Sequence, residues 1–158
     1  MKISFTGTRK GMTISQWASV ATVMAVSLDT EGGNEWHNGD AIGADHQANQ
    51  SMFNIKKMYP EFGIVTHGHP CNLPQQRAHD EYDIEHEIKP PLVRNRIMVD
   101  SSDMLIAAPF EYDEVIRGSG TWATIRYAKA HGVETWIIWP DGTKDHLPGA
   151  AKLPDIDD

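Results

Sequence analysis

The sequence predicts an α/β domain with a mostly parallel sheet of about five strands. Short apolar runs alternate with segments of helical periodicity, which is typical of this class. The chain has 158 residues, of which 40% are hydrophobic and 23% charged. That length and composition suit one domain with a sizeable core. We therefore expect a single domain over residues 1–142 and a frayed C-terminal tail over 143–158.

The first strand and the first helix have clear local signals. Lys2–Thr6 is a short apolar run that ends at a glycine. Thr13 is a candidate N-cap, and Gln16 three residues later would complete a capping box. Helical spacing of apolar residues predicts an amphipathic helix over 14–28, and these residues are Ile14, Trp17, Ala21, Met24 and Leu28.

The middle of the chain is less regular. Glu35–Asn38 is a weak second strand, and a helix is expected over about 44–58. Gly63–Thr66 is the expected third strand. The segment 67–91 is rich in His, Pro, Gln and acidic residues, which indicates a long functional loop.

The C-terminal part alternates again between helix and strand. Leu92–Ser101 has a helical pattern, and Met104–Ala108 is a short apolar strand that ends before a proline. Thr121–His131 is a helix with Gly132 as its C′ residue. Thr135–Trp139 is the fifth strand, and a Pro-Asp-Gly turn follows it.

The charge balance limits the classes of partner. Asp and Glu number 22 against 14 Lys and Arg, so the formal net charge is -8. Binders of duplex nucleic acid need a basic face to release counterions, so we expect no such partner. No apolar run has the roughly 18 residues of a membrane helix, and the N-terminus lacks a signal-peptide pattern. With Cys71 as the single cysteine, we expect a cytoplasmic protein without intrachain disulfides.

Loops rich in glycine and arginine follow the predicted strands. Ligands of open parallel sheets bind beyond the carboxyl ends of the strands, so these loops should converge. Glycines before a helix let backbone N–H groups approach a phosphate, which predicts a small phosphorylated ligand. The alternative for the last loop is a flexible segment with Thr121 as an ordinary N-cap. The candidate ligand-binding residues in these loops are Gly7, Thr8, Arg9, Gly39, Asp40, Gly43, Ala44, Pro109, Arg117, Gly118, Ser119, Gly120 and Thr121.

Asp45, Arg9 and the segment 94–96 carry further charged or polar candidates, and Asn95 is a further candidate ligand-binding residue. Asp45 could contact ribose hydroxyls or act as an acid or base, or it could be a surface carboxylate favoured by the helix dipole. Arg9 could pair with a phosphate, although a surface salt bridge is the usual role of a single arginine. In Arg94-Asn95-Arg96, at a helix start, one arginine should face the site and the other solvent.

His67, His69 and Cys71 alternate, so an extended chain would project all three to one side. They could ligate a metal with His79, Asp80 or His86 as a fourth ligand, but the spacing is not that of a structural zinc site. The sequence favours pocket-lining histidines that contact substrate, and it predicts neither a cofactor nor a metal.

The order of these motifs resembles the SLOG superfamily of nucleotide-binding proteins over about residues 1–140. The motifs are Gly-Thr-Arg after the first strand, Gly-x-x-x-Gly-Ala-Asp after the second, Arg-Asn-x-x-Met before the fourth, and Gly-Ser-Gly-Thr before the next helix. The sequence is most similar to the small YspA-like (YpsA-related) branch, and more distantly to the LOG nucleotide phosphoribohydrolases and the DNA-processing A proteins. This resemblance implies a Rossmann-like three-layer α/β/α fold and a homodimer or homotetramer.

The resemblance also implies roles for particular residues. Arg94 and Met98 match the Arg-x-x-x-Met step of the LOG enzymes, where the arginine lies in the active site. The phosphate-binding Gly-x-Gly-Thr is matched by residues 118–121. The LOG enzymes have an acidic residue two or three positions after that threonine, where this chain has Ala and Thr, and residues 110–117 are an insertion. Glu111, Asp113 and Glu114 in that insertion could supply a replacement acid or a lid.

Two functions are consistent with this sequence. The first is a protein that binds a nucleotide or a nucleotide-derived phosphorylated ligand. The second is an enzyme that hydrolyses the N-glycosidic bond of nucleoside 5′-monophosphates, with Arg94 and Asp45 as the candidate catalytic residues. A domain that keeps the fold without a ligand is the least favoured alternative, because four ligand-type loops converge.

Overall fold

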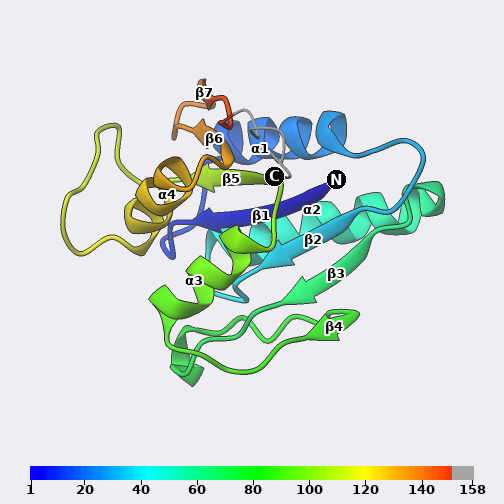
Figure 1. The fold of residues 1–158 in the computed structure, drawn as a ribbon, viewed down its shortest axis with the longest axis horizontal. Coiled ribbons are helices and arrows are strands. Elements are labelled where there is room, and N and C mark those ends of the chain that lie inside the picture. Colours follow the sequence, from blue (N-terminus) through cyan, green and yellow to red (C-terminus); the bar gives the residue numbers. More distant parts are fainter. Residues whose placement is uncertain (151–158) are drawn as a thin grey trace, which may run out of the picture.

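Seven strands form one sheet in the order β4-β3-β2-β1-β5-β6-β7 (Figure 1). The structure is a computed structural model that describes residues 1–150. Every neighbouring pair is parallel except β6 and β7. The strands are β1 (Lys2–Gly7), β2 (Glu35–Asn38), β3 (Val65–Gly68), β4 (Ile84–Glu85), β5 (Met104–Ala108), β6 (Glu134–Ile138) and β7 (Lys144–Leu147). The expected mostly parallel sheet is confirmed, with two strands more than the sequence predicts.

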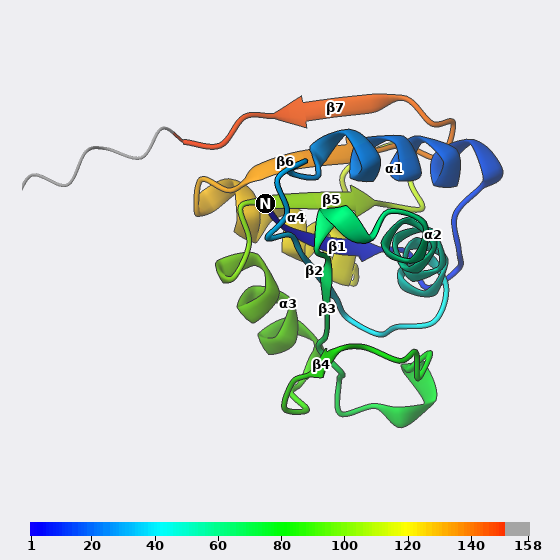
Figure 2. The ribbon, with the colours of Figure 1, turned by 90° about the vertical axis from the view of Figure 1, so that its right-hand side faces the viewer.

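Helices cover both faces of this sheet, which gives three layers (Figures 1 and 2). α1 (Ile14–Ser27) and α2 (Ala44–Met58) lie on one face, and α3 (Pro91–Asp100) and α4 (Gly120–Ala130) lie on the other. Short 3-10 helices span Pro60–Phe62 and Pro74–Gln76. Within residues 1–150, no helix has both the length and the apolar character needed to cross a membrane.

The alternation of side chains along the strands divides the core between the two faces. Ile106 of β5 packs with Phe5 and Met52 on the side of α1 and α2. The preceding residue, Leu105, packs against α4 on the opposite side. Both residues are fully buried, as expected for a central parallel strand with helices on both faces.

The N-terminus of α1 confirms part of the prediction. The Thr13 hydroxyl accepts a hydrogen bond from the Gln16 N–H at 3.0 Å, so Thr13 is the N-cap. The predicted capping box is wrong, because the Gln16 amide is buried and donates to the carbonyl oxygens of Pro109 and Ile138, both at 2.8 Å. Ile14, expected on the apolar stripe, is 87% exposed.

The prediction that residues after 142 are a tail is wrong for Lys144–Leu147. These residues form β7, which pairs antiparallel with β6 through the predicted Pro-Asp-Gly turn. Gly142 adopts a φ of 85° in that turn, which favours glycine. The end of the predicted tail, 151–158, lies outside the described residues.

The region around β3 also differs from the expectation. β3 begins at Val65 rather than Gly63, because Gly63 ends the preceding 3-10 helix with a left-handed φ of 55°. The predicted loop 67–91 contains the end of β3 and the two-residue β4. Because β3 and β4 pair in parallel, the intervening chain must return from the carboxyl end of β3 to the amino end of β4. On the way it passes the loop after β2 at the carboxyl edge, where the Ile42 N–H donates to the Gln76 carbonyl oxygen at 2.9 Å.

Candidate functional site

The N-terminus of α4 lies at the carboxyl edge of the sheet, after the loop that follows β5. Ser119 is the N-cap, and its hydroxyl accepts a hydrogen bond from the Trp122 N–H at 3.1 Å. The alternative of Thr121 as N-cap is therefore wrong, and Thr121 lies in the first turn. The first N–H groups of a helix have no intrahelical acceptor and carry the positive end of the dipole, so this turn can bind an anion.

Open space surrounds the glycines of this turn. A Cβ atom added to Gly118 would meet nothing within 4 Å, and one added to Gly120 would meet only the Asn95 side-chain nitrogen, at 4.0 Å. Gly118 has a φ of 79°, a conformation that favours glycine. The backbone of this loop is thus accessible to a ligand.

Cationic side chains lie in the loops after β1 and β5. Arg9 and Arg117 are exposed and form no ion pair with other residues in the described part of the chain. The Lys10 ammonium lies 4.1 Å from the centroid of the Phe110 ring, so the loop after β1 meets the loop after β5. Unlike the two arginines, Lys10 was not among the residues that the sequence motifs single out.

The insertion between Pro109 and Gly118 is fastened to α4. Arg126 donates to the carbonyl oxygens of Val115 at 3.0 Å and Ile116 at 3.3 Å. It also pairs with Glu114 at 3.3 Å. Glu114 thus has a cationic partner on α4, and Glu111 and Asp113 are the remaining acidic residues of the insertion.

The second glycine loop, which precedes α2, is closed by packing. A Cβ atom added to Gly7 would lie 2.6 Å from the Ala44 Cβ, and one added to Gly43 would collide with the backbone of Arg9. The first N–H of α2, that of Ala44, donates to the Thr8 carbonyl oxygen at 2.9 Å. These predicted ligand-binding residues therefore hold the loops after β1 and β2 together, and of the two glycine loops the one before α4 is open.

Arg94 is buried behind this edge and holds two loops in place. Its Nη1 donates to the carbonyl oxygens of Gly39 and His69, the latter at 3.1 Å, and its Nε donates to the Asn95 side-chain oxygen at 2.6 Å. Arg96 is exposed, which confirms that one arginine of this pair faces inward and the other solvent.

Asp45 is buried in the first turn of α2 and is 5% exposed, so the surface-carboxylate alternative is wrong. Its Oδ2 accepts a hydrogen bond from the Ala41 N–H at 3.1 Å. Burial raises the pKa of Asp45 to about 7, against the opposing attraction of Arg94. A carboxyl group with this pKa can donate or accept a proton near neutral pH.

A chain of contacts joins Asp45 to the first turn of α4. Gly39 lies between the Asp45 carboxylate and the Arg94 guanidinium, since a Cβ atom there would approach both within 3.0 Å. Arg94 contacts Asn95, whose Nδ2 donates to the Thr124 hydroxyl at 2.9 Å. That hydroxyl in turn donates to the carbonyl oxygen of residue 120 at 2.7 Å. Asn95 therefore connects the two parts of the predicted site.

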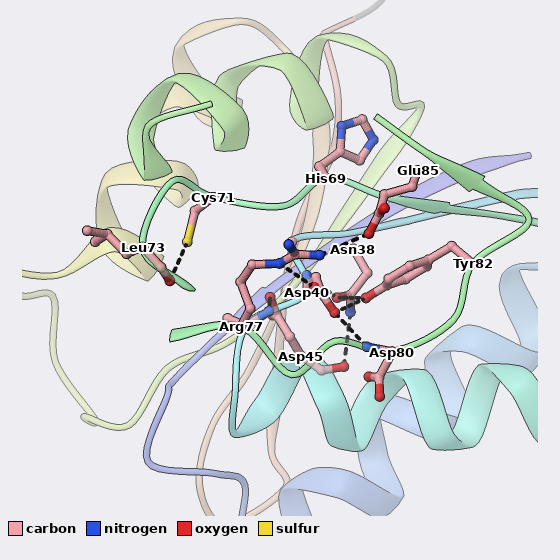
Figure 3. Close-up of polar contacts among 12 residues, drawn as sticks. Asn38, Asp40, Asp45, His69, Cys71, Leu73, Arg77, Asp80, Tyr82 and Glu85 are labelled. Atoms are coloured by element: carbon pink, nitrogen blue, oxygen red, sulfur yellow. Dashed lines mark hydrogen bonds and ion pairs between the residues drawn. The ribbon is translucent and has the colours of Figure 1, made fainter. Parts of the chain in front are cut away.

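A buried polar network supports the loop after β2 (Figure 3). Asp40 is fully buried with a φ of 55°, and its carboxylate accepts hydrogen bonds from Arg77 and Tyr82, both at 3.0 Å. The Asp80 N–H adds another at 3.0 Å. Burial raises the pKa of Tyr82, which keeps its hydroxyl a donor. Asp40 thus anchors the segment that crosses the sheet edge, a role that the sequence motifs did not reveal.

The predicted set of His67, His69 and Cys71 separates in the structure. The Cys71 thiol points to the Leu73 carbonyl oxygen, 3.6 Å away, on the other side of the chain from His69 (Figure 3). Four histidines and one carboxylate gather instead: the carboxylate contacts two of the histidines, and each of these contacts one of the other two. We name this set the histidine cluster: Glu35, His37, His67, His69 and His86. Burial lowers the pKa of His37 to about 4 and that of His69 to about 3, so both are neutral at pH 7.

Comparison with known proteins identifies the fold. No family model and no curated protein sequence matches this chain. Among solved structures, the chain is similar to the X-ray structure of TM1055, a Northeast Structural Genomics Consortium target. The two share 14% sequence identity with a TM-score of 0.53, over 85% of this chain and 71% of that chain. The chain therefore has a Rossmann-like α/β fold.

Proposed function

We propose that this chain binds a nucleotide-like phosphorylated small molecule at the carboxyl edge of its sheet. The phosphate group would lie at the first turn of α4, over residues 118–121. The observation that carries this proposal is the open N-terminus of α4, where a Cβ atom added to Gly118 would meet nothing within 4 Å and one added to Gly120 would meet only Asn95, at 4.0 Å. Backbone N–H groups and the helix dipole would hold the anion there.

The distribution of charge supports a small anion rather than a polymer. The net charge of -8 disfavours long nucleic acids, whereas Arg117 directly precedes the turn in sequence, and Arg9 and Lys10 supply positive charge in the loop after β1, which meets the loop after β5. The similarity of the motifs to the SLOG superfamily points to the same class of ligand. The nucleoside part would extend toward the loop after β2, because Asn95 and Arg94 link the α4 turn to that loop.

The buried Asp45 supports a second candidate function, the hydrolysis of nucleoside 5′-monophosphates. In that reaction the bond from the sugar C1′ to the base nitrogen breaks, and water adds to C1′. A carboxyl group with a pKa of about 7 could protonate the leaving base or take a proton from the water. Thr124 occupies a position where the LOG enzymes have an acidic residue, so Asp45 would have to supply this chemistry.

A panel of nucleoside 5′-monophosphates and their parent nucleosides distinguishes these functions. We expect saturable thermal stabilisation by monophosphates but not by nucleosides, because the phosphate is the anchored group. The double variant Arg9→Ala/Arg117→Ala should lower the affinity about tenfold, which corresponds to about 1.4 kcal/mol. Lys129→Ala, at the other end of α4, is the control and should bind as the wild type does.

Chromatography of the same mixtures tests the hydrolase. Free base that appears with the wild type and not with Asp45→Asn would support it. Stabilisation without base release would eliminate the hydrolase and leave the binding function. A chain that neither binds nor cleaves any member of the panel would contradict the proposed site.

A further inference from the structure

The histidine cluster lies on the opposite face of the sheet from α2. Trp36 faces α2, because its indole N–H donates to Asn49 of that helix at 2.9 Å. The next residue, His37, therefore points to the other face, and it is paired in register with His67 of β3. The two imidazole rings stack with their centroids 4.2 Å apart. The cluster is thus separate from the hydrogen-bonded network around Asp40.

A hydrogen bond to Glu35 fixes the protonation of His37. The Oε1 atom of Glu35 lies 3.0 Å from His37 Nε2 in a hydrogen bond, and it lies 3.4 Å from His67 Nε2. An ionised carboxylate only accepts hydrogen bonds, so His37 Nε2 carries the proton. The neutral His37 ring then has an unprotonated Nδ1 atom whose lone pair can bind a metal ion.

The Nδ1 atoms face two further histidines. His37 Nδ1 lies 2.8 Å from His69 Nε2, and His67 Nδ1 lies 2.9 Å from His86 Nε2. The rings of His69 and His86 stack with centroids 4.1 Å apart. Four imidazoles from β2, β3 and the segments directly after β3 and β4 therefore converge on one small volume.

We propose that the histidine cluster binds one divalent transition-metal ion of the Zn²⁺ class, with His37, His67 and His86 as ligands. Each of these residues offers a ring nitrogen within 4.8 Å of those of the other two. Ligands at 2.0–2.1 Å in a tetrahedral site lie about 3.3 Å apart, so a small movement of the exposed His86 completes the set. His69 or water takes the fourth position.

Glu35 supplies the outer-shell partner that such a site requires. Histidines that ligate metals donate their other N–H to a carboxylate or carbonyl, which fixes the tautomer and the ring orientation. Glu35 accepts this hydrogen bond from His37, and its carboxylate also lies 3.4 Å from His67 Nε2, which leaves the Nδ1 lone pair of His37 to the ion. An imidazole set without thiolate suits Zn²⁺, Co²⁺, Ni²⁺ and Cu²⁺ rather than Mg²⁺ or Ca²⁺.

The ion would fasten the edge of the sheet. β4 has two exposed residues and pairs with β3 at only two positions. A metal that joins His86 to His37 and His67 ties the segment after β4 to the two neighbouring strands. This role does not depend on the proposed nucleotide site.

Titration of the metal-free, tag-free protein with zinc chloride tests this inference. Calorimetry should show one ion per chain, and the melting temperature should rise with Zn²⁺ and return with EDTA. His86→Ala should weaken the affinity at least tenfold, and Glu35→Gln, which leaves the ligands in place, about tenfold. His131→Ala removes an exposed histidine at the C-cap of α4 and should bind as the wild type does.

Cobalt gives a spectroscopic check of the ligand geometry. Co²⁺ bound to the wild type should show the visible absorption of a tetrahedral site, and His86→Ala should lose it. His86 is exposed, so this variant retains the fold, which circular dichroism verifies. Absence of saturable one-to-one binding, or equal affinity of the wild type and His86→Ala, would overturn the proposal.

Discussion

Replacement of Asp45 by asparagine should change how the stability of the protein depends on pH. Burial raises the pKa of Asp45 from 3.8 to about 7 in the folded state, whereas an unfolded chain titrates near its ordinary value of about 3.9. The folded state therefore holds an additional proton between these pH values, which stabilises it in acid. This contribution is complete below about pH 4 and is lost as the pH rises through 7.

The magnitude follows from the shift in pKa. A shift of about three units, at about 1.4 kcal/mol per unit, gives about 4 kcal/mol in total, of which about 3 kcal/mol is lost between about pH 5 and pH 8. Asp45→Asn cannot titrate and keeps an oxygen that can accept the Ala41 hydrogen bond. The free energy of unfolding of the wild type should therefore fall by about 3 kcal/mol relative to that of the variant as the pH rises over that interval.

Urea unfolding at the two pH values measures this difference. The chain contains five tryptophans, so fluorescence reports the transition, and linear extrapolation gives the free energy of unfolding. All other titrating groups are present in both proteins, so their contributions cancel. A free-energy difference between wild type and Asp45→Asn that is the same at both pH values would refute a raised pKa at this position.

Two pairs of substitutions test the packing that positions the site, each by urea unfolding. Arg94→Ala leaves two buried carbonyl oxygens without a donor and should lower the free energy of unfolding by about 3 kcal/mol. Arg96→Ala, on the exposed side of α3, should cost less than about 1 kcal/mol. Gly43→Ala combines a φ of 84° with a backbone collision and should cost more than about 2 kcal/mol. Gly33→Ala, with a φ of 71° and nothing within 4 Å, should cost about 1 kcal/mol. Equal costs within either pair would contradict the packing described above.

The elements that sequence patterns predict well are those with a strong apolar period. β1, β5 and α2 agree with the prediction to within one residue. β1 and β5 are short runs in which nearly every residue is buried, and the buried positions of α2 recur with the helix period. β7 was missed because its sequence, Lys-Asp-His-Leu, is polar and mostly exposed. An edge strand of this kind owes its place to pairing with β6, which local patterns do not encode.

Local sequence patterns also predict only part of the candidate site. Composition predicts both glycine loops, before α2 and before α4, as ligand-binding. The first is closed because Gly43 and Gly7 let α2 approach β1, and this depends on contacts between residues far apart in sequence. Only the three-dimensional structure distinguishes a glycine that permits packing from one that leaves room for a ligand.

The histidine cluster depends on strand order in the same way. Alternation grouped His67 and His69 with Cys71, whereas the structure places the two histidines in the cluster and turns Cys71 away. His37 comes from β2, and it meets His67 because β2 and β3 are neighbours in register. No spacing within one segment contains that information.

A titration of isotopically labelled protein with a nucleoside 5′-monophosphate, followed by amide resonances, tests the proposed binding site most directly. If the phosphate binds at the first turn of α4, the largest chemical-shift changes occur at the amides of residues 118–121, and the parent nucleoside does not reproduce them. Changes that are absent there, or that are confined to other parts of the chain, would contradict the proposal.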